Sequence, residues 1–293
     1  MFTGVGTALI TPFDKDLNVD YKALRKICKH QVESKVDAII ILGTTGEAAV
    51  INVDERKKIT ETIQEEVNGK AKIILGTGTN DTRKVVELNK IAEEQKADGV
   101  LIVNPYYNKG TQDSLVEHYK YISERTSLPI ILYNVPSRTG MNMLPETIIK
   151  VAEACKNVIG VKEACGNISQ IAHLFSIKKD NLSVFSGNDD QTLPIMALGG
   201  AGIISVFSNS FPKELKKLTN AILENDYIIA RKLSNQYLRM MNSLFIETSP
   251  SPIKYVMNKL GLCENILRLP LAPVSKKTEA ALAPIFENFS RLN

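Results

Sequence analysis

Short runs of apolar, often β-branched residues alternate along the chain with longer segments whose apolar residues recur every three or four positions. The short runs are typical of buried strands, and the longer period is typical of helices with one buried face. Strands that alternate with helices in this way predict consecutive βα units and a parallel sheet. The predicted strands cover residues 5–10, 38–42, 72–75, 99–103, 130–133, 158–162, 183–185 and 202–206.

Helical segments between these strands stand out at residues 54–67, 81–95, 111–125 and 145–154, and several begin at a capping residue or a proline. About eight βα units without a long structureless insert predict a closed barrel, because an open doubly wound sheet usually has fewer strands. The length of 293 residues suits one such barrel. We therefore predict an α/β fold of the (β/α)8 TIM-barrel class, with the barrel core in residues 1–211.

The remaining residues, 212–293, have a helical pattern throughout, with breaks near Asn225, residues 249–252 and residues 269–273. This is more than the one helix that closes a barrel. A separate domain would want a flexible linker, and none is visible. We expect a closing helix followed by a helical extension that packs on the barrel.

The charges are scattered and nearly balanced, with 36 basic and 32 acidic residues and a formal net charge of +4. No Lys/Arg block or basic stripe with aromatics indicates nucleic acid as a partner. No apolar run approaches the roughly 18 residues of a membrane span, and the first residues lack the basic region of a signal peptide. We expect a cytoplasmic protein that contacts neither nucleic acid nor a membrane.

The four cysteines, Cys28, Cys155, Cys165 and Cys263, form no C-x-x-C pair, and the three histidines are isolated. Paired cysteines or closely spaced histidines would be needed for a zinc site, and a disulfide framework is unusual in a chain of this kind. We expect no metal and no cofactor.

Candidate chemistry gathers where the predicted strands end, which in a barrel is the face that carries the active site. Lys162 ends the sixth strand in the apolar segment V-I-G-V-K. Burial disfavours the ammonium ion and lowers the amine pKa, so a buried Lys162 could act as a nucleophile. A lysine at a strand end can also extend to solvent, and its position alone favours that interpretation.

The neighbouring strand ends supply polar groups that suit a small acid. Thr44 and Thr45, between two glycines, offer hydroxyl and N–H groups for a carboxylate. Tyr133 and Tyr107 could transfer protons, or could be aromatics at the barrel mouth. Arg138, after a turn with a proline, could bind a second carboxylate or remain a surface arginine.

Two further patterns at the last strands favour structural roles. Asp189 and Asp190 resemble a carboxylate pair, but their place directly before a helix indicates that they cap its amino end. The segment G-G-A-G at residues 199–202 resembles a phosphate loop only weakly, because it precedes its strand and lacks G-x-G-x-x-G.

Taken together, four motifs resemble the dihydrodipicolinate synthases, a family within the pyruvate-dependent lyases and aldolases. They are G-T-T-G-E at 43–47, N-P-Y-Y-N at 104–108, Y-N-V-P-S-R-T-G at 133–140 and G-V-K-E-A at 160–164. The resemblance covers essentially the whole chain. It implies that Lys162 forms a Schiff base with pyruvate, and that Thr45, Gly187 and the backbone at Ile204 bind the substrate.

The resemblance also implies a proton relay of Thr44, Tyr107 and Tyr133, in which the family's equivalent of Tyr107 comes from the partner subunit. Arg138 would bind the carboxylate of the second substrate, aspartate semialdehyde. The enzyme would then be a homo-oligomer, in the family's habit a tetramer built as a dimer of dimers. It would catalyse the first committed step towards diaminopimelate and lysine.

Competing functions come from the same superfamily or from loss of activity. N-acetylneuraminate lyases and 2-keto-3-deoxy sugar-acid aldolases share the lysine, the tyrosine and a similar G-x-T-G-E loop. Their sugar substrates carry hydroxyls where aspartate semialdehyde has a carboxylate, so Arg138 favours the synthase. A barrel that binds a keto acid without turnover is disfavoured by the intact lysine, tyrosines and threonines.

Lysine-inhibited members of the family line a pocket between subunits with Ser, two His, Asn, Glu and Tyr. The matching positions here are Ala48, Val53, Arg56, Asn80, Lys84 and Tyr106. Only the asparagine and the tyrosine are retained, and the acid has become a lysine. Reversing a charge at close range changes an interaction by about 1 to several kcal/mol, so we predict weak or absent inhibition by lysine.

Overall fold

Eight parallel strands form a closed barrel in the computed structural model, which describes residues 2–292. Each strand pairs with its neighbours in chain order, and the last pairs with the first. The strands are β1 (Gly4–Ala8), β2 (Ala38–Ile41), β3 (Lys72–Gly76), β4 (Gly99–Val103), β5 (Ile130–Asn134), β6 (Val158–Glu163), β7 (Ser183–Ser186) and β8 (Gly202–Ser205). The predicted TIM-barrel class is confirmed, and every predicted strand overlaps an observed one.

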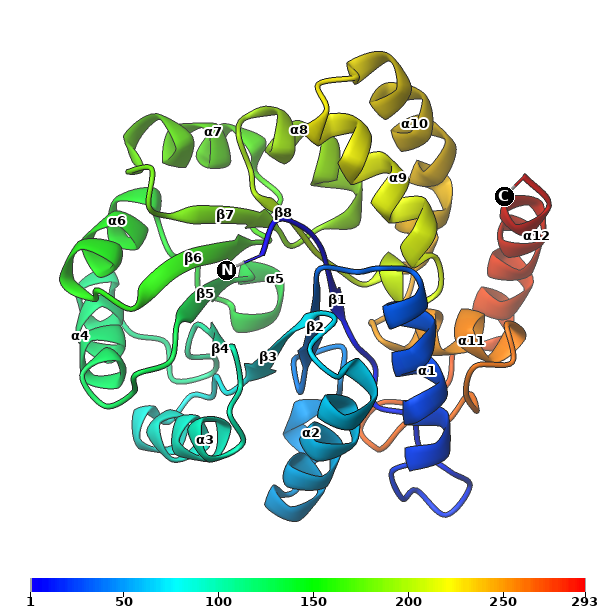
Figure 1. Ribbon diagram of the computed structural model, residues 1–293, viewed down its shortest axis with the longest axis horizontal. Coiled ribbons are helices and arrows are strands. Elements are labelled where there is room, and N and C mark those ends of the chain that lie inside the picture. The colour runs from blue at the N-terminus through cyan, green and yellow to red at the C-terminus, as the bar shows by residue number, and fades with distance from the viewer. Residues whose placement is uncertain (1, 293) are drawn as a thin grey trace.

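Helices surround the barrel, one after each strand (Figure 1). They are α1 (Tyr21–Glu33), α2 (Val53–Val67), α3 (Thr82–Glu94), α4 (Gln112–Ser123), α6 (Pro145–Ala154), α7 (Ile168–Ile177), α8 (Thr192–Ala197) and α9 (Pro212–Leu223). Several begin at side-chain caps, such as Asp81 and Thr111, because these oxygens accept bonds from free N–H groups of the first turn. Asn52 and Glu55 form a complete capping box at α2.

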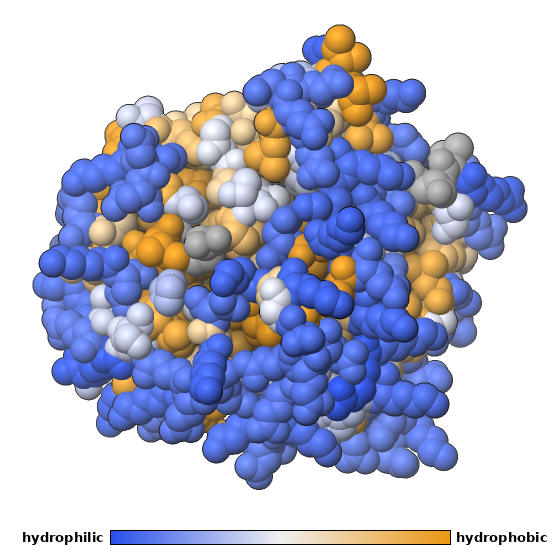
Figure 2. Space-filling view, in the orientation of Figure 1, coloured by the Kyte–Doolittle hydropathy of each residue, from blue (hydrophilic) through white to orange (hydrophobic). Residues whose placement is uncertain are grey.

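Apolar side chains fill both the barrel interior and the layer between the strands and the helices. Phe2 closes the amino end of the interior and stacks on Phe185, with the ring centroids 4.5 Å apart. Hydrophilic residues cover most of the face in Figure 2, and hydrophobic ones show in separate patches, one of which protrudes at the top near α10. The barrel is therefore a packed core whose free chemistry lies at its rim.

The carboxyl-terminal extension consists of α10 (Tyr227–Ser243), α11 (Ser251–Lys259) and α12 (Lys276–Leu292). Aromatic contacts join it to the barrel, since the Phe289 ring of α12 lies 4.6 Å from Phe211, which precedes α9, and 5.6 Å from Tyr237 of α10. No helix among residues 2–292 is both long and apolar enough to cross a membrane.

The sequence interpretation of this extension was wrong in one segment. It placed only a short break at residues 269–273, whereas residues 260–275 contain no helix. Gly261 has a left-handed φ of 67°, which ends α11, and Pro270 and Pro273 prevent a new helix soon after. The backbone N–H of Arg268 bonds to a side chain of the barrel instead of a preceding carbonyl.

Candidate active site

The carboxyl ends of the strands surround a cavity of about 500 Å³. Of the residues predicted to form the site, Thr44, Thr45, Tyr133, Arg138, Lys162 and Gly187 line it. They come from four different strand ends or the loops that follow, those of β2, β5, β6 and β7, so the barrel brings together residues up to 143 positions apart, from 44 to 187.

Lys162 projects from β6 and is only 4% exposed. Its Nζ lies 4.4 Å from the centre of the Tyr133 ring. Burial lowers the pKa of the Lys162 amine to about 7; the nearby Asp189 carboxyl opposes this effect and Arg138 adds to it. A large fraction of the amine is therefore neutral, and nucleophilic, near neutral pH.

Tyr133 lies beside Lys162 because the two residues are partners in the β5–β6 register. Burial raises the pKa of its phenol to about 12, although Arg138 and a hydrogen bond with Thr44 act in the opposite direction. The phenol therefore holds its proton at neutral pH. It can donate that proton to a reacting oxygen and recover it through Thr44.

The loop with Thr44 and Thr45 is a tight turn that packs closely on the barrel at Gly46. The N–H of Gly46 donates to the Gly43 carbonyl at 3.1 Å, and the N–H of Glu47 donates to the Thr44 carbonyl at 3.1 Å. A Cβ on Gly46 would lie 3.1 Å from the Leu9 carbonyl oxygen. Thr45 is buried and Thr44 is half-buried, so both face the cavity with little freedom.

Arg138 lies in the single-turn helix α5 (Pro136–Thr139), which directly follows β5. Pro136 at its first position presets the turn. One guanidinium nitrogen, Nη2, donates to the Ser249 carbonyl at 2.9 Å, which tethers the exposed side chain at the rim of the cavity. The remaining N–H groups of the Arg138 guanidinium can donate hydrogen bonds to a carboxylate.

Two predicted residues lie elsewhere. Ile204 in β8 is buried in the barrel interior and is not among the residues that line the cavity. Tyr107 is 91% exposed in the β4–α4 loop and has a left-handed φ of 70°. Its own chain does not bring the Tyr107 phenol to Lys162.

Asp189 is a correction to the sequence interpretation. Neither Asp189 nor Asp190 caps the following helix, since α8 has no side-chain cap. The Asp189 carboxyl instead accepts bonds from the Ser205 hydroxyl and from the N–H groups of Val206 and Phe207, after β8. It is 3% exposed, and its charge acts on the Lys162 amine.

A second group that sequence reasoning missed lies behind Lys162 and Tyr133. Asn134 and Glu163, the next residues along β5 and β6, bond to each other at 3.0 Å, and Asn104 donates to Asn134 at 3.1 Å. Burial raises the pKa of the Glu163 carboxyl. This buried network fixes the ends of three neighbouring strands, and the only sequence signal was a polar residue after each one.

The glycines within residues 199–202 allow close packing of the backbone, and the structure does not support a phosphate site there. A Cβ on Gly202 would lie 2.0 Å from the Gly4 carbonyl oxygen, so only glycine lets β8 approach β1. Among residues 2–292, no three His, Cys, Asp or Glu side chains are grouped to hold a metal ion.

Comparison with known proteins gives one consistent result. The sequence model of the dihydrodipicolinate synthetase family matches residues 1–288. A Fervidobacterium nodosum protein named 4-hydroxy-tetrahydrodipicolinate synthase is 46% identical over 293 residues, covering all of both chains. The similarly named Thermotoga maritima protein is 46% identical over 290 residues, or 98% of each.

Solved structures agree. A crystal structure of dihydrodipicolinate synthase from Thermotoga maritima has a TM-score of 0.97 at 45% identity and covers 99% of both chains. The enzyme from Aquifex aeolicus has a TM-score of 0.96 at 40% identity, with 99% of this chain and 98% of that one covered.

Proposed function

The chain belongs to the dihydrodipicolinate synthetase family, and from this membership we propose that Lys162 is the residue on which its reaction takes place. That reaction, performed by a class I aldolase-type lyase, joins pyruvate to L-aspartate 4-semialdehyde on the diaminopimelate route to lysine. The observation that supports Lys162 most is a buried amine with a pKa near 7 at the wall of the cavity.

Each step follows from that amine. The neutral Lys162 nitrogen attacks the pyruvate ketone, and loss of water leaves an imine. Loss of a proton from the methyl group gives an enamine, whose carbon attacks the aldehyde and forms a C–C bond. The amino group of the second substrate then attacks the imine carbon and displaces Lys162, which releases cyclic 4-hydroxy-tetrahydrodipicolinate and regenerates the enzyme.

The cavity residues receive roles that suit their positions. Thr44 and Tyr133 relay the protons, since they contact each other and the Tyr133 ring adjoins Lys162. Thr45 and Gly187 hold pyruvate, and the family resemblance assigns the backbone at Ile204 to the same task, although Ile204 does not line the cavity in this chain. Gly187 suits this place because a Cβ there would come 2.6 Å from Ala164 Cβ and 3.1 Å from Lys162 Cε, the carbon that carries the reacting amine.

The relay needs a second subunit in this proposal. Tyr107 is almost fully exposed and has a left-handed backbone conformation, a costly geometry that proteins retain mainly at functional sites. A symmetric dimer would place the partner subunit's Tyr107 beside Thr44. We therefore propose at least a dimer, assembled as a dimer of dimers, and a cytoplasmic location.

Arg138 chooses the second substrate. Its tethered guanidinium can bind the carboxylate of aspartate semialdehyde in a bidentate pair, which a sugar hydroxyl cannot match. A steady-state assay of pyruvate with aspartate semialdehyde, N-acetylmannosamine and sugar aldehydes tests this choice. We expect turnover with aspartate semialdehyde to dominate; faster turnover of a sugar aldehyde would refute the choice.

Weak or absent inhibition by lysine is part of the same proposal. Lys84 forms an ion pair with Glu87 at 2.8 Å on the surface, so no acid occupies this position to receive an effector's ammonium group. Arg56 uses its guanidinium internally, donating to the Gly76 carbonyl at 3.0 Å. Activity should be unchanged in lysine concentrations that inhibit sensitive relatives, and a sub-millimolar inhibition constant would overturn this proposal.

A further inference from the structure

Glu47 directly follows the turn that carries Thr44 and Thr45, and its side chain is completely buried. Its backbone has a left-handed φ of 54°, a conformation that a residue other than glycine holds only when its surroundings enforce it. The Thr11 hydroxyl fixes the preceding residue by donating to the Gly46 carbonyl at 2.7 Å. The position of the Thr44–Thr45 turn therefore depends on what holds Glu47.

Both Glu47 carboxylate oxygens are held by the carboxyl-terminal extension. The buried Lys254 ammonium in α11 donates to Oε1 at 2.5 Å and to the Ile266 carbonyl at 2.9 Å. The backbone N–H of Arg268 donates to Oε2 at 3.1 Å. The segment without helix, residues 260–275, thus has a defined contact with the catalytic end of the barrel.

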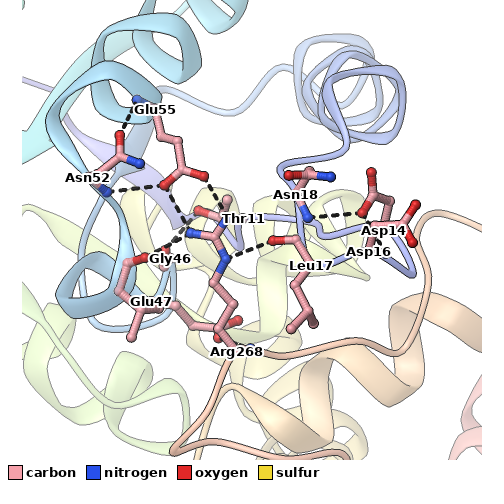
Figure 3. A network of polar contacts seen from close by, with 11 residues as sticks. Thr11, Asp14, Asp16, Leu17, Asn18, Gly46, Glu47, Asn52, Glu55 and Arg268 are labelled. Atoms are coloured by element: carbon pink, nitrogen blue, oxygen red, sulfur yellow. Dashed lines mark hydrogen bonds and ion pairs between the residues drawn. The ribbon is translucent and has the colours of Figure 1, made fainter.

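Arg268 in turn fastens this segment to the barrel (Figure 3). Its guanidinium donates to both oxygens of Glu55 in α2, and also to the Val50 and Leu17 carbonyls. The Phe13 ring packs against both cations, with its centre 4.2 Å from Lys254 Nζ and 4.4 Å from the Arg268 guanidinium carbon. The Glu47–Lys254 pair is therefore fully buried, and Arg268 anchors it from a partly exposed position.

The same extension reaches the opposite side of the cavity. The Ser249 carbonyl, two residues before α11, accepts the bond from Arg138. Ser249, just before α11, and Lys254 within α11 therefore contact Arg138 and Glu47, at or beside the two parts of the site that would hold the two substrates.

We infer that Glu47, Lys254 and Arg268 form a positioning cluster, by which the extension sets the Thr44–Thr45 turn for pyruvate. A buried ion pair adds little stability compared with apolar side chains of the same size, so stability alone does not account for it. What the ion pair between Glu47 and Lys254 does provide is a fixed position for Glu47 and for the Thr44–Thr45 turn. This inference rests on the proposed function, because the turn matters only if it binds the keto acid.

The double variant Glu47→Gln/Lys254→Met tests this role without leaving one buried charge unpaired. We expect kcat/KM for pyruvate, and the rate of forming the borohydride-trapped adduct, to fall about 10- to 100-fold, as for a misplaced binding group. The matched control is Asp37→Asn/Lys216→Met, which removes an ion pair of 2.8 Å at the amino end of the barrel. The control should lose thermal stability without losing either rate.

A folded double variant with rates equal to those of the control would overturn the inference. If the double variant does not fold, Glu55→Gln decides the question, because it removes the ion pair that holds the partly exposed Arg268 side chain, while glutamine can keep the capping box with Asn52. A fall of about threefold or more in the pyruvate rates supports positioning; unchanged rates reject it. Failure of the proposed function would differ, since wild-type protein itself would then form no adduct.

Discussion

Lys162 and Asp189 are two buried groups whose opposite effects set the reactivity of the site. Burial pushes the Lys162 pKa down, and the Asp189 charge pushes it up. Asp189 accepts three hydrogen bonds from residues 205–207, which help it to remain ionised inside the protein. The pKa of the Lys162 amine therefore stays near neutral pH and does not fall far below it.

A lowered lysine pKa reduces folding stability. Folding lowers the Lys162 pKa from 10.5 to about 7, so below that pH both states are charged and the folded state carries the full cost. Lys162→Met should therefore stabilise the protein by on the order of 4 kcal/mol below pH 7, and the gain should vanish as pH approaches 10.5. Denaturant unfolding across this pH range measures the difference. The exposed Lys276→Met serves as control; an equal gain at every pH would contradict the account.

Asp189→Asn should move the acid limb of the pH profile of kcat/KM for pyruvate to lower pH, because removing the negative charge lowers the Lys162 pKa further. It should also cost about 1 to 3 kcal/mol of stability, since an amide N–H would face the N–H groups of Val206 or Phe207. Asp190→Asn, at the exposed neighbouring position, should change neither. An acid limb that stays in place, or moves to higher pH, would show that Asp189 does not tune the amine.

Sequence alone predicts some of these residues and not others for a physical reason. Lys162 lies at the end of a strand, Thr45 and Arg138 follow strands, and a barrel gathers the residues at its strand ends. Asp189 also follows a strand, but its partners lie after a different strand, so local sequence favoured a helix cap. Glu47 is bound by Lys254, 207 residues away, a pairing that no local pattern encodes.

At the scale of elements, α5 and the extension act together on Arg138. α5 is too short for a period of apolar residues to reveal it, and residues 260–275 are ordered by distant contacts rather than by helix propensity. By contrast, the four helices for which the sequence predicts bounds, α2, α3, α4 and α6, lie within about two residues of the prediction, because their periodicity and caps are local signals.

Replacement of Arg138 tests this arrangement. Arg138→Ala should raise KM for aspartate semialdehyde about 10- to 100-fold, as for the loss of a charged hydrogen-bond partner, while pyruvate still forms an adduct. The acid limb of the pH profile should move to higher pH, because Arg138 lowers the Lys162 pKa. Arg138→Lys should restore the limb but little of the affinity, since it keeps the charge without the planar fork. Unchanged KM for both variants would remove Arg138 from the site.

At the scale of the whole molecule, the eight repeated βα units in the sequence predict the closed barrel. They do not predict whether one chain alone supplies every residue of the site. One chain gathers Lys162, Tyr133 and Thr44 in a cavity and leaves Tyr107 in solvent. Assembly is a property of the surface, and a residue of the partner subunit cannot be inferred from the periodicity of one chain.

Mixing two inactive variants tests whether subunits share the site. Tyr107→Phe lacks the relay phenol and Lys162→Met lacks the nucleophile, but a mixed dimer would contain one site with both groups intact. Exchange of subunits should restore about a quarter of the wild-type activity, the share expected from random pairing. Activity no greater than the sum of the separate variants would place Tyr107 outside a shared site.

The central claim is that the reaction takes place on the Lys162 amine, and borohydride reduction in the presence of pyruvate tests it most directly. Mass spectrometry of the digested protein should locate one reduced pyruvate adduct per chain, on the peptide that contains Lys162. Lys162→Met, folded and treated alike, should carry none. An adduct on another lysine, or no adduct on the wild-type protein, would contradict the account.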